Sequence, residues 1–117
     1  MKPYTRAERV AELMQRALAD ILRKSVKDPR LDSVSITKIK MSADLKLATV
    51  YYVTSGMDAD RKGTAEGFDK ASGFIRSALA RSIELRYVPR LRFLYDETIE
   101  YGIHMNQILN NLSTHES

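Results

Sequence analysis

Residues 69–86 have the sequence DKASGFIRSALARSIELR, and the spacing of their apolar side chains decides the fold prediction. Ile75, Leu79 and Ile83 recur every four residues and extend a face begun by Phe68 and Ala71, which predicts an amphipathic helix over about 64–87. Gly73 interrupts this helix, where glycine is less favourable than alanine by roughly 1 kcal/mol. The spacing therefore predicts two helices that meet at Ala71-Ser72-Gly73.

The segments on both sides of this helix pair predict an α+β domain. Thr5-Arg6-Ala7-Glu8 matches a capping box, and the helix that follows it is expected to stop at Asp28-Pro29. Strands are predicted at 34–41, 47–54 and 91–95, and the long connection before the third allows it to run parallel to the second. The expected order is helix, strand, strand, broken helix pair, strand and a short C-terminal helix. Such a chain forms a small mixed three-stranded sheet with its helices on one face.

The composition is that of one small domain. The chain has 117 residues, of which 1–112 are predicted to form a single domain and 113–117 a disordered tail. It lacks an apolar run long enough to span a membrane, and the charges in MKPYTRAERV argue against a signal peptide, so a cytoplasmic protein is expected. Because there is no cysteine, disulfides and thiolate metal sites are excluded.

The net charge of +4 is unevenly distributed along the chain. Residues 1–30 have eight basic and four acidic side chains, and residues 70–92 have six basic and one acidic. Residues 93–117 have four acidic side chains and no lysine or arginine. If the fold brings the two basic segments together, they form a patch for a polyanion. Charge alone equally allows two solvated helix faces.

The predicted break at Ala71-Ser72-Gly73 is the strongest candidate site. A break would expose the first N–H groups of the second helix, which together with the helix dipole favour an anion. Lys70, Arg76 and Arg81 lie within two turns of the break, and glycine would let a phosphate backbone approach closely. Alternatively, Gly73 permits close packing of this helix on the first helix. Residue spacing leaves both interpretations open.

Signals for catalysis are weak in this sequence. His104 and His115 have no partner at metal-ligand spacing, and no metal or cofactor is expected. Asp96, Glu97 and Glu100 could act as acid and base, but acidic residues between a strand and a helix more often cap the helix. One of Tyr51 and Tyr52 is expected to face the core, which leaves the other as a stacking candidate.

Several of these segments, in the same order, resemble the ribosome-binding factor A family, bacterial assembly factors of the small ribosomal subunit. The resemblance covers about residues 4–110, and its most specific part runs from Lys70 to Phe93. The segments that carry it are RAERVAELMQRALADIL, DPRL, VSITKIKMSADLKLATVYY, KASGFIRSALARSIELRYVPRLRF and DETIEYGIHMNQIL. This family has a type II KH-like fold with a kinked helix pair.

The resemblance implies a function as well as a fold. KH domains clamp a nucleic-acid backbone with a Gly-x-x-Gly loop, and this family has an Ala-x-Gly kink instead, here Ala71-Ser72-Gly73. It implies a non-enzymatic factor that binds the 16S rRNA of the immature small (30S) subunit, with roles in late maturation, rRNA processing and growth at low temperature. A monomer is expected. A basic module that docks acidic protein partners is the alternative.

The residues expected to contact RNA combine the break with nearby basic and aromatic side chains. Gly73 would permit the approach, the cations would neutralise phosphates, and Phe74 could stack on a base. Basic residues near the first helix would extend the contact. The full set is Lys70, Ala71, Ser72, Gly73, Phe74, Arg76 and Arg81, with Arg6 and Arg9 and, in addition, Lys2.

Overall fold

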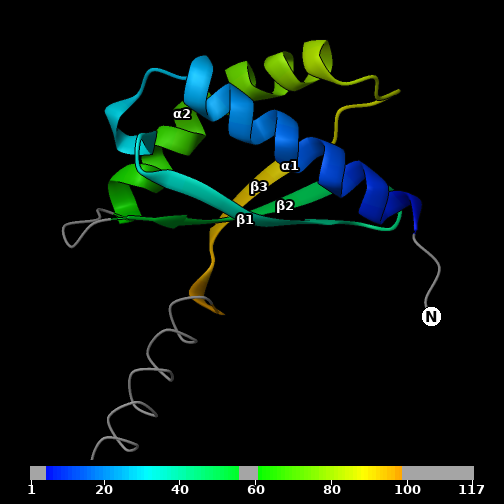
Figure 1. Ribbon diagram of the computed structural model, residues 1–117, viewed down its shortest axis with the longest axis horizontal. Coiled ribbons are helices and arrows are strands. Elements are labelled where there is room, and N and C mark those ends of the chain that lie inside the picture. The colour runs from blue at the N-terminus through cyan, green and yellow to red at the C-terminus, as the bar shows by residue number, and fades with distance from the viewer. Residues whose placement is uncertain (1–4, 56–60, 99–117) are drawn as a thin grey trace, which may run out of the picture.

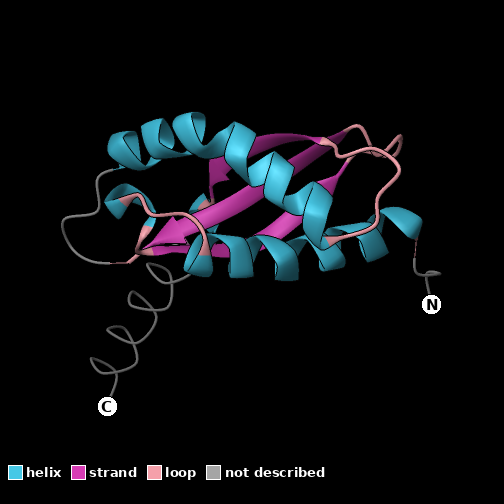
Figure 2. Cartoon of the chain, turned by 90° about the horizontal axis from the view of Figure 1, so that it is seen from above, coloured by secondary structure: helices cyan, strands magenta, loops and turns pink. Residues whose placement is uncertain are grey.

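Two long helices cover one face of a three-stranded sheet (Figure 1, Figure 2). This arrangement is seen in a computed structural model that describes residues 5–55 and 61–98. The order of elements confirms the predicted α+β class, with helix, strand, strand, helix and strand in sequence. A short C-terminal helix was predicted within residues 96–112, and its part from residue 99 onward lies outside the described residues, as does the tail at 113–117.

The first helix, α1, spans Arg6–Lys24 and begins at the predicted cap. The Glu8 N–H donates to Thr5 Oγ1 at 3.1 Å, which satisfies one of the N–H groups that a helix start leaves without a partner. The apolar stripe buries Val10, Met14, Leu18 and Ile21. The expected stop at Asp28-Pro29 was wrong by four residues, because α1 ends at Lys24 and Ser25 caps it through a bond to Ile21.

Asp28 and Pro29 instead begin a short 3-10 helix, η1, at Pro29–Leu31. The Asp28 carboxylate accepts the Arg30 backbone N–H and both Nε and Nη2 of the Arg30 guanidinium, at 3.0, 3.0 and 2.8 Å. The guanidinium lowers the pKa of Asp28 from its ordinary 3.8 to about 2. This turn fixes the next residue, Leu31, whose side chain is buried against α2.

The sheet has the order β1-β2-β3, with β2 in the centre. Strand β1 (Val34–Met41) pairs antiparallel with β2 (Leu47–Thr54), and β2 pairs parallel with β3 (Arg90–Tyr95). The predicted bounds of the first two strands and the parallel third strand are confirmed. The imperfect alternation of β1 comes from an irregularity in the register between Ile36 and Lys38, which leaves Thr37 without an opposite residue on β2.

The second helix, α2, spans Arg61–Ser82 as one continuous helix, so the predicted separation into two helices was wrong. The single helix is nevertheless bent. Figure 1 shows the two halves of α2 running in different directions, and Figure 2 shows the same bend from above. A helix can bend at a glycine and keep its hydrogen-bonded form. The residues of the expected break are therefore helical, and α2 also begins and ends earlier than predicted.

Both halves of α2 are anchored in the core. Phe68 lies in the first half, and its ring stacks on Phe93 of β3 with centroids 4.2 Å apart and meets Tyr52 of β2 at 4.8 Å. Ile75 and Leu79 in the second half are completely buried. The bend therefore lies between two fixed segments.

We expect Gly67 and Gly73 of α2 to respond differently to substitution. A Cβ at Gly67 would lie 3.2 Å from Leu31 Cδ2, whereas outside its own helix segment Gly73 has nothing within 4 Å of that position. Gly73→Ala should therefore stabilise the fold by up to about 1 kcal/mol through helix propensity. Gly67→Ala should gain less than this, and Gly67→Leu should destabilise by roughly 1–3 kcal/mol through overpacking.

Urea unfolding followed by circular dichroism measures both changes in the free energy of unfolding. Equal effects of the alanine substitution at positions 67 and 73 would contradict the difference in packing between the two glycines.

We also expect the Asp28–Arg30 pair to make stability depend on acidity. The folded state holds the pKa of Asp28 at about 2, below its ordinary 3.8, so its stabilising effect is complete above about pH 4 and disappears as the pH falls toward 2. Asp28→Asn should therefore lower the unfolding midpoint at pH 7, and its difference from the parent chain should shrink between pH 4 and 2. A difference that stays constant over this range would show that the carboxylate charge is not responsible.

Candidate nucleic-acid interface

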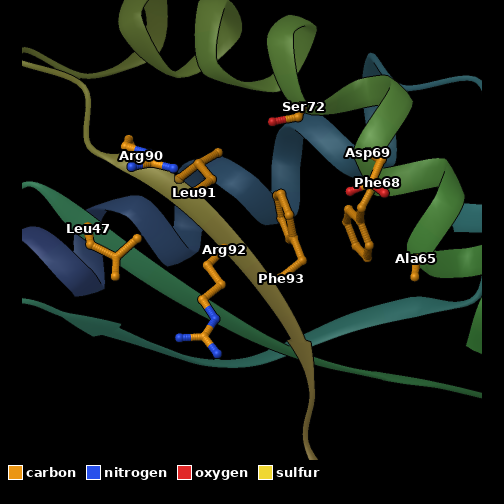
Figure 3. A pocket seen from close by; sticks show the side chains of 9 residues that line it. All are labelled: Leu47, Ala65, Phe68, Asp69, Ser72, Arg90, Leu91, Arg92 and Phe93. Atoms are coloured by element: carbon orange, nitrogen blue, oxygen red, sulfur yellow. The ribbon is translucent and has the colours of Figure 1, made fainter.

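A groove of about 450 Å³ lies between the bend of α2 and the edge strand β3. Figure 3 shows Ser72 pointing from α2 toward β3, with Leu91 and Phe93 on the strand and Phe68 coming down from the helix. Arg90 and Arg92 line the groove on the β3 side. The groove therefore joins one residue of the predicted site to two arginines that the prediction did not include.

The register of β3 decides which of its side chains point to the groove. Leu91 and Phe93 pair with Ala48 and Val50 of β2, which are both fully buried beneath the helices. Alternation along the strand then sends Arg90 and Arg92 to the opposite face, and Figure 3 shows Arg92 extending away from α2. The groove is therefore apolar on the helix-facing side of β3, Arg90 and Arg92 border it from the other side of the strand, and Asp69 of α2 is the acidic residue that lines it.

Most of the predicted site residues on α2 are exposed and lie on two flanks of the helix, whereas Ala71 is half-buried and packs against the core. Lys70 is close enough to Asp28 of the neighbouring turn to help lower its pKa, so it lies on the η1 side. Helical spacing continues this flank to Phe74 and Arg81, and the Phe74 side chain is 47% exposed. Ser72 lies on the other flank, in the groove, and helical spacing places Arg76 there too. Helical spacing puts Gly73, which is exposed, between the two flanks.

Continuity of α2 changes the chemistry expected at Ala71-Ser72-Gly73. The prediction that the first N–H groups of a second helix are exposed here was wrong, because no helix starts at these residues. The packing alternative for Gly73 is also not supported, since its missing side chain faces open space. Gly67 of α2 does pack closely, against Leu31, and the pattern of the sequence did not single it out.

Arg76 has a structural contact in addition to its exposed position. Its Nη2 donates to the backbone carbonyl of Val88 at 3.1 Å and so ties α2 to the loop before β3. A guanidinium has five N–H donors, so this bond leaves capacity for an anion. Arg76 can therefore position the loop and meet a phosphate at the same time.

Arg6 lies near a different part of the basic surface from the bend. It lines a second cavity together with Arg86 and Arg90, at the start of α1. Arg90 borders both this cavity and the groove beside Ser72. The two basic segments of the sequence are therefore connected through Arg90, although Arg6 itself is not part of the groove. Arg9 is exposed on α1 and lines neither of the two.

Asp96 follows the last residue of β3, and its carboxylate accepts hydrogen bonds from neighbouring residues. Its carboxylate is 3% exposed, accepts the Thr37 hydroxyl at 2.5 Å and the Thr98 N–H at 3.1 Å, and is also bonded to the Thr98 hydroxyl. The bonds from Thr37 and Thr98 lower the pKa of Asp96 and so favour its ionised form. Glu97 is exposed and lies 3.5 Å from Arg61, and Glu100 falls outside the described residues.

The two tyrosines of β2 divide as expected. Tyr52 is buried, and burial raises the pKa of its hydroxyl. Tyr51 faces the side of the sheet that is opposite to the helices, with the Lys38 ammonium 4.8 Å from its ring centroid. Tyr51 is therefore the tyrosine of this pair that remains available for stacking.

Among residues 5–55 and 61–98, no group of three or more acidic or histidine side chains is placed to hold a metal ion. In the same part of the chain, neither helix has the length and apolar character needed to cross a membrane. His104 and His115 lie outside it.

Curated proteins called ribosome-binding factor A resemble this chain over nearly its whole length. The one from Desulfosudis oleivorans is 45% identical over 114 residues, which cover 97% of this chain and 88% of that protein. The one from Geotalea uraniireducens is 41% identical and covers 97% of this chain and 93% of that protein. This chain therefore matches these proteins over nearly the full length of both partners in the comparison.

Solved structures give the same result for the fold. The crystal structure of ribosome-binding factor A from Thermus thermophilus matches with a TM-score of 0.69 and 27% identity, over 76% of this chain and 93% of that one. A Thermus thermophilus homology model, fitted into a cryo-electron microscopy map of a 30S–RbfA complex, matches with a TM-score of 0.60 and 29% identity, over 70% and 86%. These neighbours confirm the α+β class that the order of elements predicts and the KH-like fold that the family resemblance implies.

A family model adds the final comparison. The model for ribosome-binding factor A matches residues 6–109, which include α1, all three strands and the whole of α2. The match thus covers both flanks of the bend and the groove beside β3. With its sequence relatives and its fold in agreement, this chain belongs to the ribosome-binding factor A family.

Proposed function

We propose that this protein is a non-enzymatic assembly factor that binds the 16S rRNA of the immature small ribosomal subunit. The observation that carries the proposal is the arrangement of exposed cations on both flanks of the α2 bend, beside an open groove. The related Thermus thermophilus protein has been fitted into a map of a 30S complex, which supports the same partner here. In this proposal the protein acts in late maturation of the small subunit, in rRNA processing and in growth at low temperature. It does so in the cytoplasm.

The RNA backbone crosses α2 at Gly73 in this proposal. Lys70 and Arg81 lie on one flank and Arg76 on the other, so a strand that contacts all three must pass over the helix between them. Gly73 lies on that path without a side chain, and its missing Cβ would have nothing nearby but solvent. A larger side chain would hold the phosphates away from the helix. The glycine therefore matters for approach, and the free helix N-terminus is not needed.

Phosphate contacts give affinity, and shape gives selectivity. Lysine and arginine that neutralise phosphates release counterions but do not read the sequence. Phe74, exposed on the Lys70 flank, offers a ring on which an unpaired base can stack. Arg90 and Arg92 extend the cationic path along the edge of β3.

The salt dependence of binding tests the cations. Lys70→Ala and Arg81→Ala should each make the negative slope of log K against log salt shallower by about 0.7–0.9, because each removes one phosphate contact. Arg23→Ala is the matched control, since Arg23 pairs with Asp20 at 2.7 Å near the end of α1. Equilibrium binding to purified small subunits at several salt concentrations gives the slopes. Equal slopes for the parent chain and both variants would remove Lys70 and Arg81 from the interface.

The size of the side chain at position 73 tests the crossing. Gly73→Leu should weaken binding to small subunits by about tenfold or more while the free energy of unfolding stays close to that of Gly73→Ala, because a Cβ at this position faces open space. Binding that is unchanged by leucine would place the RNA elsewhere. Urea unfolding of the same preparations separates loss of binding from loss of structure.

Nuclease treatment separates RNA binding from the alternative, a module that docks acidic proteins. We expect the protein to sediment with precursor small subunits and to stay in the supernatant after their rRNA is digested. Sedimentation that persists on the remaining ribosomal proteins would favour the protein-docking alternative.

A further inference from the structure

The second cavity, at the start of α1, has the properties of a pocket for a single base. Its volume is about 630 Å³, within the range of pockets that enclose small ligands. It lies where the beginning of α1, the turn between β1 and β2 and the loop between α2 and β3 come together, at the end of the molecule where α1 starts in Figure 1. The function proposed above does not use it.

The wall of this cavity is apolar and its rim is cationic. The wall is formed by Val10, Leu45, Leu85, Val88 and Pro89. The rim contributes Arg6, Lys46, Arg86 and Arg90. Asp44 is the one acidic residue that lines it, and its carboxylate already accepts the Ser42 hydroxyl at 2.7 Å and the Lys46 N–H at 3.1 Å. The cations around the opening therefore favour a negatively charged ligand, and the apolar wall favours one that also has a flat apolar part.

Tyr87 supplies an aromatic surface at this cavity. It also lines the cavity, and it is 76% exposed, the most exposed of the large apolar and aromatic side chains in the described part of the chain. The Arg86 guanidinium lies 5.7 Å from its ring centroid. An exposed tyrosine beside an arginine is the combination on which single-stranded nucleic acids stack a base and place its phosphate.

Two of the three segments around the cavity, the turn between β1 and β2 and the loop before β3, are held by hydrogen bonds before any ligand binds. The Arg90 N–H donates to the Lys46 carbonyl at 2.8 Å, and the Arg76 guanidinium donates to the Val88 carbonyl at 3.1 Å. Leu45 forms part of the wall from a left-handed backbone conformation with φ of 62°. A cavity fixed in this way need not be ordered by its ligand, which favours binding.

From these contacts we infer that the cavity binds one unpaired RNA nucleotide, with its base between Tyr87 and the apolar wall and its phosphate on the arginines of the rim. The inference rests on the proposed function in taking RNA as the partner. Arg90 lines both this cavity and the groove beside Ser72, so a strand that crosses α2 can continue along β3 to place a nucleotide here. The cavity adds a selection for unpaired RNA that the phosphate contacts cannot provide.

A hexamer of uridylate and an abasic ribose-phosphate hexamer of equal charge distinguish a base from a phosphate contact. Fluorescence anisotropy with the full chain should give tighter binding of the uridylate hexamer by about tenfold. Tyr87→Ala should abolish this preference and leave binding of the abasic hexamer unchanged, whereas Tyr87→Phe should retain it. Arg86→Ala should weaken binding of both hexamers. Leu13→Ala is the control for truncation of an exposed apolar side chain away from the cavity, and it should change neither.

Three results would overturn the base pocket. One is a uridylate affinity that does not change in Tyr87→Ala, and another is an equal loss for both hexamers. The third is a hexaglutamate peptide that binds with the same dependence on Tyr87, because the occupant would then be an acidic protein segment. Sedimentation with small subunits keeps the two proposals apart. If the parent chain sediments with subunits but does not prefer the uridylate hexamer, the pocket fails alone. Lack of sedimentation would count against the proposed function itself.

Discussion

Phe68 ties α2 to the sheet, and the positions of the bend and of the groove beside it depend on that contact. Its ring stacks on Phe93 of β3 and meets Tyr52 of β2, and the neighbouring Gly67 brings the helix against Leu31. The first half of α2 is thereby fixed to both the sheet and the 3-10 turn. The second half is fixed separately by Ile75 and Leu79. The two halves run in different directions, so the helix bends between these two fixed segments, and the groove beside β3 opens next to that bend.

The parts of the fold that follow from local pattern could be predicted from the sequence. The bounds of β1 and β2 and the cap at Thr5 agree with the structure, because alternation and capping are properties of a few neighbouring residues. The end of α1 could not be predicted from Asp28-Pro29, since Ser25 caps the helix earlier and the proline starts a new turn. The continuity of α2 could not be predicted either, because it depends on contacts with the core. The buried residues on both sides of Gly73 hold the helix together despite the cost of a glycine.

The site could be predicted only in part, because its geometry depends on contacts between distant segments. Residues 70–74, Arg76 and Arg81 were predicted as site residues, and the structure places most of them in solvent on α2. Arg90 and Arg92 belong to the same basic segment, yet their place at the groove follows from the register of β3 against β2. The arrangement of Arg6, Lys46 and Tyr87 around one cavity likewise requires three chain segments to meet. The one hint of this cavity in the sequence is that a tyrosine, Tyr87, directly follows an arginine, Arg86.

The two outer strands of the sheet have a consequence for how copies of this protein meet one another. Strands with a free edge are templates for pairing with another chain. Here β3 alternates Arg90 and Arg92 with its core residues, and β1 alternates Lys38 and Lys40 in the same way. A second copy that approached either edge would bring cations against cations, which destabilises cross-strand pairs. The positive charge on both edge strands therefore disfavours the joining of two copies into a longer sheet.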